Sequence, residues 1–493
     1  MGQKFFDMSS DKKFQNYING KWISSISGKE YEVFNPANKS ELLGTVSFCS
    51  KKDVDLAIDA ASSSLHSWSN FTAPERGEIL FEALRIMDSR KLDLAETITL
   101  EEGKVLADSE AEVKRSMNII QFSAGEGRRL LGNIKQSEIK NNVAYTMRKP
   151  LGVVGIITPW NFPLAIPAWK IAPALICGNT VIFKPAISTP LSAIKLVEIF
   201  EEAGLPPGVI NLVTGSGSEI GQSLVEDNRV QGISFTGSTE IGTKIYSDGA
   251  SKLKKVQCEM GGKNAVIVLK DADIEKAAKD VVVGAFGSTG QRCTATSRVI
   301  IEQEIYDEFM DKVLILTEDL KVGNGIDPDT DMGPLSSLDQ LEKVTEYIGL
   351  GVEQGGKILI GGNRLEGKTF DDGFYVEPTI FTDVDKENIV AKEEIFGPVL
   401  VSFKASDLSE ALDIANDVEF GLSSSIYTKD IKEAYKYINN VDTGMVHVNS
   451  PTLGGEVHLP FGGLKSSGVG HREQGEEGFN FFSEIISVYI DHS

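Results

Sequence analysis

The chain has few cysteines, and none of them stands in a pattern that forms disulfides or binds metal. Its 493 residues include four cysteines, which are far apart and form no C-x-x-C pair: Cys49, Cys177, Cys258 and Cys293. The five histidines likewise show no metal-ligand spacing. We therefore expect a protein of a reducing compartment, without a disulfide framework and without a catalytic metal.

Long apolar segments are also missing. The first 20 residues lack the continuous apolar stretch of a signal peptide. Residues 151–169 approach the length of a membrane span, but Asn161 and three prolines interrupt them, which indicates a buried strand followed by an irregular loop. These absences predict a cytoplasmic protein that does not enter a membrane.

Positive charge is scarce relative to negative charge. Lysine and arginine number 49 against 71 acidic residues, so the net charge is −22 and most of the surface should repel nucleic acid and anionic membranes. A small molecule is the ligand class that remains. If that molecule is an anion, it needs a local basic site within a cleft to overcome the repulsion.

The rest of the composition is that of a folded α/β protein. Hydrophobic residues make up 41% of the chain, and at ~150 residues per domain its length corresponds to about three domains. From residue 150 onward, β-branched runs such as 151–157 and 180–183 alternate with segments of helix length. One of these segments, 189–204, opens with Thr189 and Pro190, which suit the start of a helix. Repeated strand–helix units predict a doubly wound sheet.

A second alternating region runs to about residue 445, and no flexible linker separates it from the first. We expect two domains packed over a shared cleft. The C-terminal residues 481–493 form an apolar, alternating run typical of an exposed strand. Such a strand either adds to the edge of another copy of the chain or pairs within its own sheet, and the sequence leaves both open.

Two glycine turns follow apolar runs and open helices, at residues 215–221 and 237–242. Each could offer backbone N–H groups and a helix N-terminus to a phosphate. Neither matches the G-x-G-x-x-G fingerprint, because the first spaces its glycines differently and the second has Thr239 at the middle position. Plain strand–helix connections are an equally good interpretation of either turn alone.

Cys293 lies in the stretch AFGSTGQRCTATSR, residues 285–298, between glycines and directly after Arg292. A lone cysteine is more often a buried filler than a nucleophile, so its neighbours alone leave its role open. Seven motifs place it in a wider pattern. They are ITPWNFPLAIPAWKIAPAL (157–175), FKP (183–185), FTGSTEIG (235–242), EMGGKN (259–264), GQRC (290–293), EEIFGP (393–398) and PFGGLKSSG (460–468).

In order and distance these motifs resemble the aldehyde dehydrogenase superfamily, and the resemblance runs from about residue 15 to the end. The resemblance implies an α/β subunit with a Rossmann-like cofactor domain, a catalytic domain and a small β region for oligomerisation. We assign residues 1–130 and 151–258 to the cofactor domain and residues 259–447 to the catalytic domain. Residues 131–150 and 470–493 then form the oligomerisation region, and a homodimer or homotetramer is expected.

The resemblance also implies the activity, which is NAD(P)-dependent oxidation of an aldehyde to a carboxylic acid through a cysteine thioester. Cys293 corresponds to the nucleophile, Glu259 to the general base and Asn161 to the oxyanion donor. The chemistry needs these groups, because a thiolate attacks the aldehyde, an N–H stabilises the alkoxide, and a carboxylate activates water. Glu259 favours hydrolysis over transfer to coenzyme A. All three residues are present, which argues against a catalytically silent structural relative.

The same resemblance suggests how NADP or NAD is held. It places Lys184 at the adenosine ribose, Gly237 and Ser238 at the pyrophosphate, and Glu394 with Phe396 at the nicotinamide ribose. Trp160 and Lys170 are expected to line the same cleft. The strictly NAD-dependent relatives carry a glutamate three residues after the lysine, where this chain has Ile187. Without that repelling charge, we expect NADP to be accepted.

The substrate residues are predicted in the same way. Phe162, Trp169 and Phe461 resemble the aromatic lining of the substrate tunnel. Arg292 and Arg115 then suit an anionic aldehyde, because two guanidinium groups can bind a carboxylate or phosphate bidentately. Surface ion pairs are the alternative for both arginines.

Three groups of relatives compete as models for the substrate. The non-phosphorylating glyceraldehyde-3-phosphate dehydrogenases share GQRC, but they carry a tyrosine in place of Phe162 and a further arginine before PFGG, which the loop 450–463 lacks. Residues 454–475 resemble the 2-oxoglutarate semialdehyde (2,5-dioxopentanoate) dehydrogenases. We therefore expect that semialdehyde, with His458 and Ser450 as further polar contacts and succinate semialdehyde as the close alternative.

Overall fold

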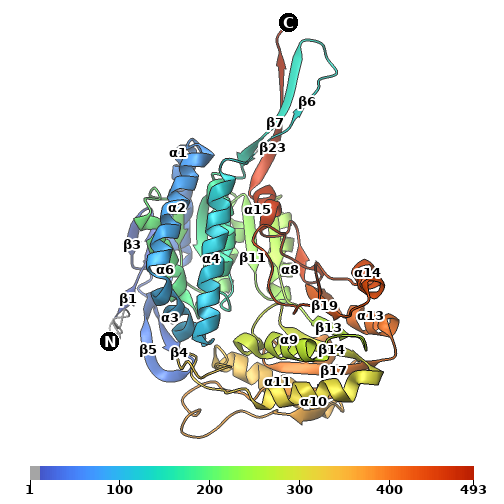
Figure 1. Ribbon diagram of the computed structural model, residues 1–493. Helices are drawn as coiled ribbons and strands as arrows, with labels where there is room; N and C mark the ends of the chain where they lie inside the picture. Colours follow the sequence, from blue (N-terminus) through green and yellow to red (C-terminus); the bar gives the residue numbers. More distant parts are fainter. Residues whose placement is uncertain (1–11, 131) are drawn as a thin grey trace.

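The computed structural model describes residues 12–130 and 132–493. The fold has two large sheets, one above the other in Figure 1, and a narrow ribbon of strands extends away from both. Within the described parts of the chain, every helix is too short or too polar to cross a bilayer. The N-terminal residues 1–11 and Leu131, where two of the predicted domain segments begin, lie outside the described residues.

The first sheet has eight strands in the order β22-β12-β11-β8-β9-β10-β2-β3, and its five central strands are parallel. Across the sheet from β10 to β12, these strands are the third, second, first, fourth and fifth of the five in chain order. This is the order of a dinucleotide-binding doubly wound sheet. In such a sheet the binding crevice opens at the carboxyl ends of the strands where the order reverses, here between β8 and β11. The strands are β2 (Asn16–Ile18), β3 (Lys21–Ile23), β8 (Val153–Ile157), β9 (Thr180–Lys184), β10 (Ile210–Leu212), β11 (Gly232–Thr236), β12 (Lys255–Glu259) and β22 (Gly468–Val469).

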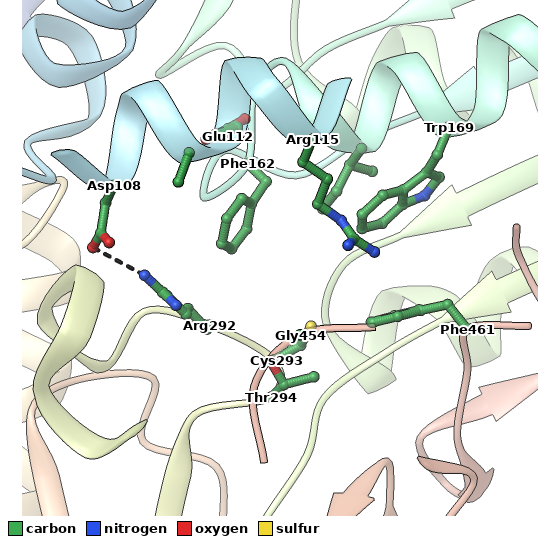
Figure 2. Close-up of a pocket in the computed structure, with 12 residues that line it drawn as sticks. Asp108, Glu112, Arg115, Phe162, Trp169, Arg292, Cys293, Thr294, Gly454 and Phe461 are labelled. Carbon is green, nitrogen blue, oxygen red and sulfur yellow. Dashed lines mark ion pairs between the residues drawn. The ribbon is translucent and has the colours of Figure 1, made fainter. Parts of the chain in front are cut away.

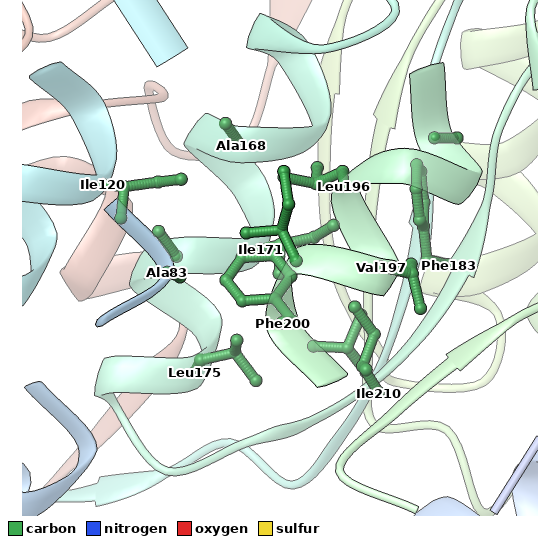
Figure 3. Packing of buried hydrophobic residues seen from close by; sticks show 14 of the residues in the cluster. Ala83, Ile120, Ala168, Ile171, Leu175, Phe183, Leu196, Val197, Phe200 and Ile210 are labelled. Atoms are coloured by element: carbon green, nitrogen blue, oxygen red, sulfur yellow. The ribbon is translucent and has the colours of Figure 1, made fainter. Parts of the chain in front are cut away.

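Helices cover this sheet, and α6 shows why the sequence forms them. The helix expected at 189–204 is α6, which starts at Pro190 and buries an apolar face that includes Val197 and Phe200. These side chains pack against Phe183 of β9 and Ile171 of α5 (Figure 3), and burying each stabilises the fold by roughly 1.5–3 kcal/mol. The helices are α1 (Lys51–Ser69), α2 (Ala73–Ser89), α3 (Lys91–Glu102), α4 (Leu106–Glu126), α5 (Ala165–Ile176), α6 (Pro190–Glu202), α7 (Gln222–Glu226), α8 (Thr239–Ala250) and α15 (Gly475–Phe481).

The second sheet has seven strands in the order β15-β16-β17-β14-β13-β19-β20, and all but β15 are parallel. Its strands are β13 (Asn264–Val268), β14 (Thr296–Glu302), β15 (Lys357–Ile360), β16 (Thr379–Thr382), β17 (Val399–Ala405), β19 (Ser423–Tyr427) and β20 (Met445–Val448). Its helices are α9 (Ile274–Phe286), α10 (Tyr306–Glu318), α11 (Leu338–Glu353), α12 (Ile389–Lys392), α13 (Leu408–Asn416) and α14 (Ile431–Asn440). Because β13 follows β12 after four residues, the amino ends of this sheet face the carboxyl ends of the first.

The C-terminal strand β23 (Ser483–Asp491) pairs antiparallel with β7 (Asn142–Pro150) along its whole length, and β6 (Ile134–Lys135) adds a third strand. Pairing within the same chain, one of the two alternatives, therefore occupies one edge of β23. Its other edge carries no strand among the described residues, because the order is β23-β7-β6. Figure 1 shows this ribbon standing clear of the two large sheets.

Two small sheets complete the fold. β1 (Lys13–Phe14), β5 (Asn38–Ser47) and β4 (Glu30–Asn35) form one, and β18 (Phe420–Gly421) pairs with β21 (Leu464–Lys465) in the other. The strand β22 pairs with β12, so the chain returns to the first sheet after the second is complete. The division into three domains at the predicted boundaries stays a prediction.

Candidate active site

Residues that are far apart in the sequence meet where the two sheets face each other. The segment after β8 brings Trp160, Asn161 and Phe162, and β12 ends at Glu259. The loop between α9 and β14 brings Cys293 from the second sheet. Cys293 lines two separate cavities, one on each side of it. A nucleophile between two cavities can meet one ligand from each side.

The loop that carries Cys293 is held in place by Asn264. The Asn264 side-chain Nδ2 donates to the carbonyl oxygens of Cys293 and Ala295, both at 2.8 Å, and its Oδ1 accepts from the N–H of Ser423 at 2.9 Å. Ser288, earlier in the loop, has a left-handed backbone with φ 49°. Sequence reasoning missed Asn264, although it ends the EMGGKN motif.

The Cys293 thiol is partly buried and feels the charges of nearby carboxylates. Burial raises its pKa to about 12, with further contributions from Glu394, Glu259 and Glu473, while a hydrogen bond from the Thr294 N–H opposes the rise. The thiol is therefore protonated at neutral pH in the ligand-free site and has to lose its proton as it attacks.

Asn161 lies beside Cys293 on the wall of the second cavity. Its Nδ2 donates to the carbonyl oxygen of Gln291 at 2.9 Å, and this bond uses one of its two N–H groups. Its backbone carbonyl accepts from Lys104 Nζ at 2.5 Å. The second N–H of the amide has no hydrogen-bond partner among the described residues and can donate to a ligand oxygen.

Glu259 is buried at the end of β12 but lines neither of the two cavities that meet at Cys293. Its Oε2 accepts from the N–H of Gly463 at 3.3 Å, and its Oε1 has no partner among the described residues. A Cβ on Gly462 would lie 2.3 Å from that Oε1, so only glycine lets the PFGG loop approach this closely. Burial and Glu473 raise the pKa of Glu259 well above its usual range, although Arg472 and Lys170 oppose the rise.

The second cavity, of about 170 Å³, contains most of the predicted cofactor residues. Trp160 and Phe396 meet edge to face with their ring centroids 5.3 Å apart, and Glu394 accepts from the N–H of Gly262 at 2.8 Å. Gly237 and Ser238 line the same cavity at the start of α8. The Ser238 side chain forms no capping hydrogen bond with α8 among the described residues. The first N–H groups of α8 therefore lack a side-chain cap and can donate to a ligand. This donor set fits a dinucleotide pyrophosphate.

Three predicted cofactor residues lie elsewhere, and none of them lines the two described cavities at Cys293. Lys184 ends β9, and its Nζ donates to the carbonyl of Pro185 at 3.0 Å; burial lowers its pKa to about 8. Ile187 packs against the hydrophobic core of the first sheet. Lys170 is fully buried and donates to Ser234 and Glu473, so it does not line the cleft as expected.

The first cavity, of about 260 Å³, contains all five predicted substrate residues (Figure 2). Trp169 and Phe461 pack with their ring centroids 5.3 Å apart, and Phe162 faces them from the segment after β8. Cys293, Thr294 and Gly454 also line this cavity. His458 lies in a neighbouring outer hollow with Arg115, where it pairs with Glu456 at 3.1 Å, and Ser450 lines neither the cavity nor that hollow.

The two arginines of this cavity differ in their partners. Arg292 forms an ion pair with Asp108 at 2.9 Å, and Asp108 also accepts from the N–H and the hydroxyl of Ser288. Burial opposes ionisation of Asp108, but Arg292 and Ser288 outweigh it and hold the pKa of Asp108 below its usual range. The charge of Arg292 is therefore compensated within the protein.

Arg115 has only neutral hydrogen-bond acceptors. Its guanidinium donates to the carbonyl of Gly455 and to the side-chain oxygen of Gln474, and it lies 5.8 Å from the ring centroid of Trp169. No carboxylate of the described residues forms an ion pair with it. Figure 2 shows the Arg115 guanidinium beside Trp169, on the side of the cavity away from the Asp108–Arg292 pair. Arg115 is thus a positive charge on the cavity wall without a carboxylate partner among the described residues.

Sequence reasoning missed the acidic side chains of α4 that share this wall. Asp108, Glu112 and Arg115 all line the cavity from α4. Their spacing of four and three residues places them on one helical face, and this pattern in the sequence could have been used to find them.

The match to known proteins covers nearly the whole chain. Residues 22–488 match the aldehyde dehydrogenase family model. This chain belongs to the aldehyde dehydrogenase family. The alpha-ketoglutaric semialdehyde dehydrogenase of Bacillus subtilis (strain 168) is 45% identical over 483 residues, which are 98% of this chain and 99% of that protein.

Solved structures agree with this assignment. A betaine aldehyde dehydrogenase from Staphylococcus aureus in complex with NAD+ has a TM-score of 0.95 at 34% identity, over 98% of this chain and 95% of that chain. An NADP-dependent enzyme from E. coli has a TM-score of 0.94 at 36% identity, over 97% of both chains. The family, the α/β fold, the NAD(P)-dependent oxidation of an aldehyde and the cofactor class predicted from the sequence are confirmed.

Proposed function

We propose that Cys293, Asn161 and Glu259 carry out the oxidation and that a carboxylated semialdehyde is the substrate. The single observation that supports the substrate most strongly is the uncompensated guanidinium of Arg115 on the wall of the cavity that ends at Cys293. The Bacillus subtilis relative, named for alpha-ketoglutaric semialdehyde, agrees with this substrate class. We propose 2-oxoglutarate semialdehyde, with succinate semialdehyde as the shorter alternative.

The reaction begins when the Cys293 thiol gives its proton to solvent water and the sulfur forms a bond to the aldehyde carbon. The carbonyl oxygen then becomes an alkoxide, which accepts the free N–H of Asn161. When bound, NAD(P)+ supplies the hydride acceptor for conversion to the thioester. Glu259 takes a proton from water, and the resulting hydroxide attacks the thioester. The C–S bond then breaks to release the acid, and the leaving thiolate takes the proton back from Glu259, which regenerates the thiol. To act, the Glu259 carboxylate has to turn from Gly463 toward Cys293.

The cofactor is held at the carboxyl edge of the first sheet. Gly237 and Ser238 precede α8 and would hold the pyrophosphate, and Glu394 with Phe396 would hold the nicotinamide ribose. A Cβ on Gly261 would lie 2.4 Å from the Glu394 carboxylate, so glycine at this position allows Glu394 to face the cavity. Lys184 would bind the adenosine ribose from the end of β9.

Ile187 makes the choice of cofactor testable. The change Ile187→Glu is expected to raise KM for NADP by ~10-fold or more, because a carboxylate would repel a 2′-phosphate near Lys184. KM for NAD should change far less. Ile187→Gln is the matched neutral control, and steady-state kinetics with both cofactors check the effect. Equal changes for NAD and NADP, or no change for NADP, would contradict the proposal.

Arg115 makes the substrate testable. The change Arg115→Met is expected to raise KM for 2-oxoglutarate semialdehyde by ~10–100-fold, because a hydrogen bond to a charged group stabilises by about 1.5–3 kcal/mol. A neutral aldehyde of equal length should be affected far less. Arg115→Lys keeps the charge but loses the bidentate geometry, and we expect an intermediate KM.

Arg292 serves as the comparison within the same cavity. Since Asp108 already compensates its charge, Arg292→Met should raise KM for the charged substrate less than Arg115→Met does. Kinetics with succinate semialdehyde in parallel would rank the two chain lengths. A uniform loss for charged and neutral aldehydes in Arg115→Met would reject the anionic substrate.

We also infer that the ribbon of β6, β7 and β23 joins copies of the chain into a homodimer or homotetramer. β23 has an open edge among the described residues, and its side chains Ile485 and Tyr489 are 60% and 71% exposed. Apolar side chains on an unpaired strand edge favour pairing with another chain.

A further inference from the structure

A fully buried lysine, Lys104, lies behind residues that line the substrate cavity, and the proposed mechanism gives it no role. Lys104 lies between α3 and α4 and has no solvent exposure. Its Nζ donates to the backbone carbonyl of Asn161 at 2.5 Å and to Glu112 Oε2 at 2.8 Å. It also lies 4.0 Å from the ring centroid of Phe162. One ammonium group thus contacts the predicted oxyanion donor, its neighbour in the sequence and a carboxylate of the cavity wall.

Glu112 holds the other end of the same segment. While its Oε2 accepts from Lys104, its Oε1 accepts from the N–H groups of Leu164 and Ala165 at 2.9 and 3.0 Å. These N–H groups belong to the start of α5. The Lys104–Glu112 ion pair therefore contacts residues 161–165 at both ends.

We propose that Lys104 and Glu112 are positioning residues that hold the amide of Asn161 where the alkoxide forms. This inference rests on the proposed role of Asn161 as oxyanion donor. An oxyanion donor stabilises the transition state only when its N–H is held at about 2.7–3.1 Å from the developing charge. A displacement of about 1 Å can lower the rate by ~10²-fold. Charge-assisted hydrogen bonds to the backbone on both sides of the donor resist such a displacement.

Stability alone is a poor explanation for this pair. Both side chains are completely buried, and a second buried carboxylate, Glu102, lies 3.9 Å from Lys104 Nζ. Replacing a buried ion pair with neutral side chains of similar volume is often neutral or stabilising, whereas removing one partner leaves an unpaired charge. The contacts of the Lys104–Glu112 pair instead indicate that it holds residues 161–165 in place.

The test removes both charges together. In the double variant K104M/E112Q, methionine still packs against the Phe162 ring, and glutamine keeps an acceptor for the α5 N–H groups. We expect the single-turnover rate of NAD(P)H formation to fall by ~30–100-fold, because Asn161 loses the bond to its carbonyl. The Kd of the cofactor and the rate of Cys293 alkylation by iodoacetamide should each stay within ~3-fold, because neither of them depends on the alkoxide.

The N161A background separates positioning from a general effect on the fold. If Lys104 and Glu112 act through Asn161, adding K104M/E112Q to N161A should lower the single-turnover rate by less than ~3-fold further, since residues that act as a unit are not additive. Losses that multiply in the triple variant, or an unchanged rate in K104M/E112Q alone, would overturn the inference.

Two further variants keep the test decisive. K195M/D93N removes a largely buried ion pair between α6 and α3, 2.6 Å long in the protein, and should leave the single-turnover rate within ~2-fold. If K104M/E112Q does not fold, E112Q alone should lower the rate by ~10-fold in the wild-type background and not in N161A, and a wild-type rate would refute the pair's role. A wild-type rate in N161A would instead reject Asn161 as the donor and, with it, the proposed mechanism.

Discussion

Replacing Cys293 with serine is expected to lower aldehyde oxidation by at least ~10³-fold, because a hydroxyl forms no useful anion near neutral pH and cannot form the thioester. The protein fixes both the backbone and the sulfur of Cys293. Asn264 fixes the backbone of the cysteine through its carbonyl, and the Thr294 N–H points at the sulfur. NAD(P)H production at saturating aldehyde, followed by absorbance, measures the effect.

A matched cysteine separates chemistry from folding in this experiment. Cys49 is also buried, but it lies in the segment before α1, and its N–H donates to the carbonyl of Thr214. Cys49→Ser should leave turnover within ~2-fold, since the residue is outside the site. If Cys293→Ser kept more than a few per cent of turnover, another nucleophile would have to carry the reaction.

The second large effect is expected at Glu259. The change Glu259→Gln should leave the first turnover of NAD(P)H formation nearly intact but slow the steady state by ~10²–10⁴-fold, because no base then activates the water that cleaves the thioester. The acyl group should accumulate on Cys293. Rapid-mixing absorbance measures the burst, and the mass of the intact protein reveals the acylated form. A burst and a steady state that fall together would place Glu259 in the first half of the reaction instead.

The pH profile of the wild-type enzyme follows from the same residue. Burial and Glu473 raise the pKa of Glu259, and a base acts only as the carboxylate. The deprotonated fraction grows as pH rises through the raised pKa, so the steady-state rate should increase with pH over that interval. In Glu259→Gln this dependence should be lost.

Much of the fold followed from local patterns. Pro190 at the start of α6 and the β-branched runs of β8 and β9 could be predicted directly, because helix-start residues and hydrophobic periodicity act within a few residues. Thr189 precedes the helix as expected, but its side chain does not cap it and donates to the carbonyl of Trp160 instead. The family motifs located Cys293, Asn161 and the glycines before α8 for the same reason: each motif is contiguous.

The partners of charged side chains could not be read in this way. Arg292 and Arg115 looked equivalent in the sequence, as two guanidinium groups near one opening. In the structure Asp108 compensates Arg292, whereas Arg115 donates to the neutral groups of Gly455 and Gln474 and has no ion-pair partner among the described residues. Lys170 was expected in the cofactor cleft, but burial places it against Glu473 instead. Which charge remains uncompensated depends on which segments cross in space.

The sequence by itself determined the family and the doubly wound sheet and predicted the reacting residues, because these depend on short motifs and on the alternation of apolar residues. Only the tertiary structure decided what surrounds those atoms. It decided that Asn264 donates to the Cys293 carbonyl and that Lys104 donates to the Asn161 carbonyl, 57 residues away in the sequence. It also decided that the Glu259 carboxylate accepts from Gly463. Such contacts arise where loops and strand ends from distant parts of the chain meet, and burial then sets the strength of every charge among them.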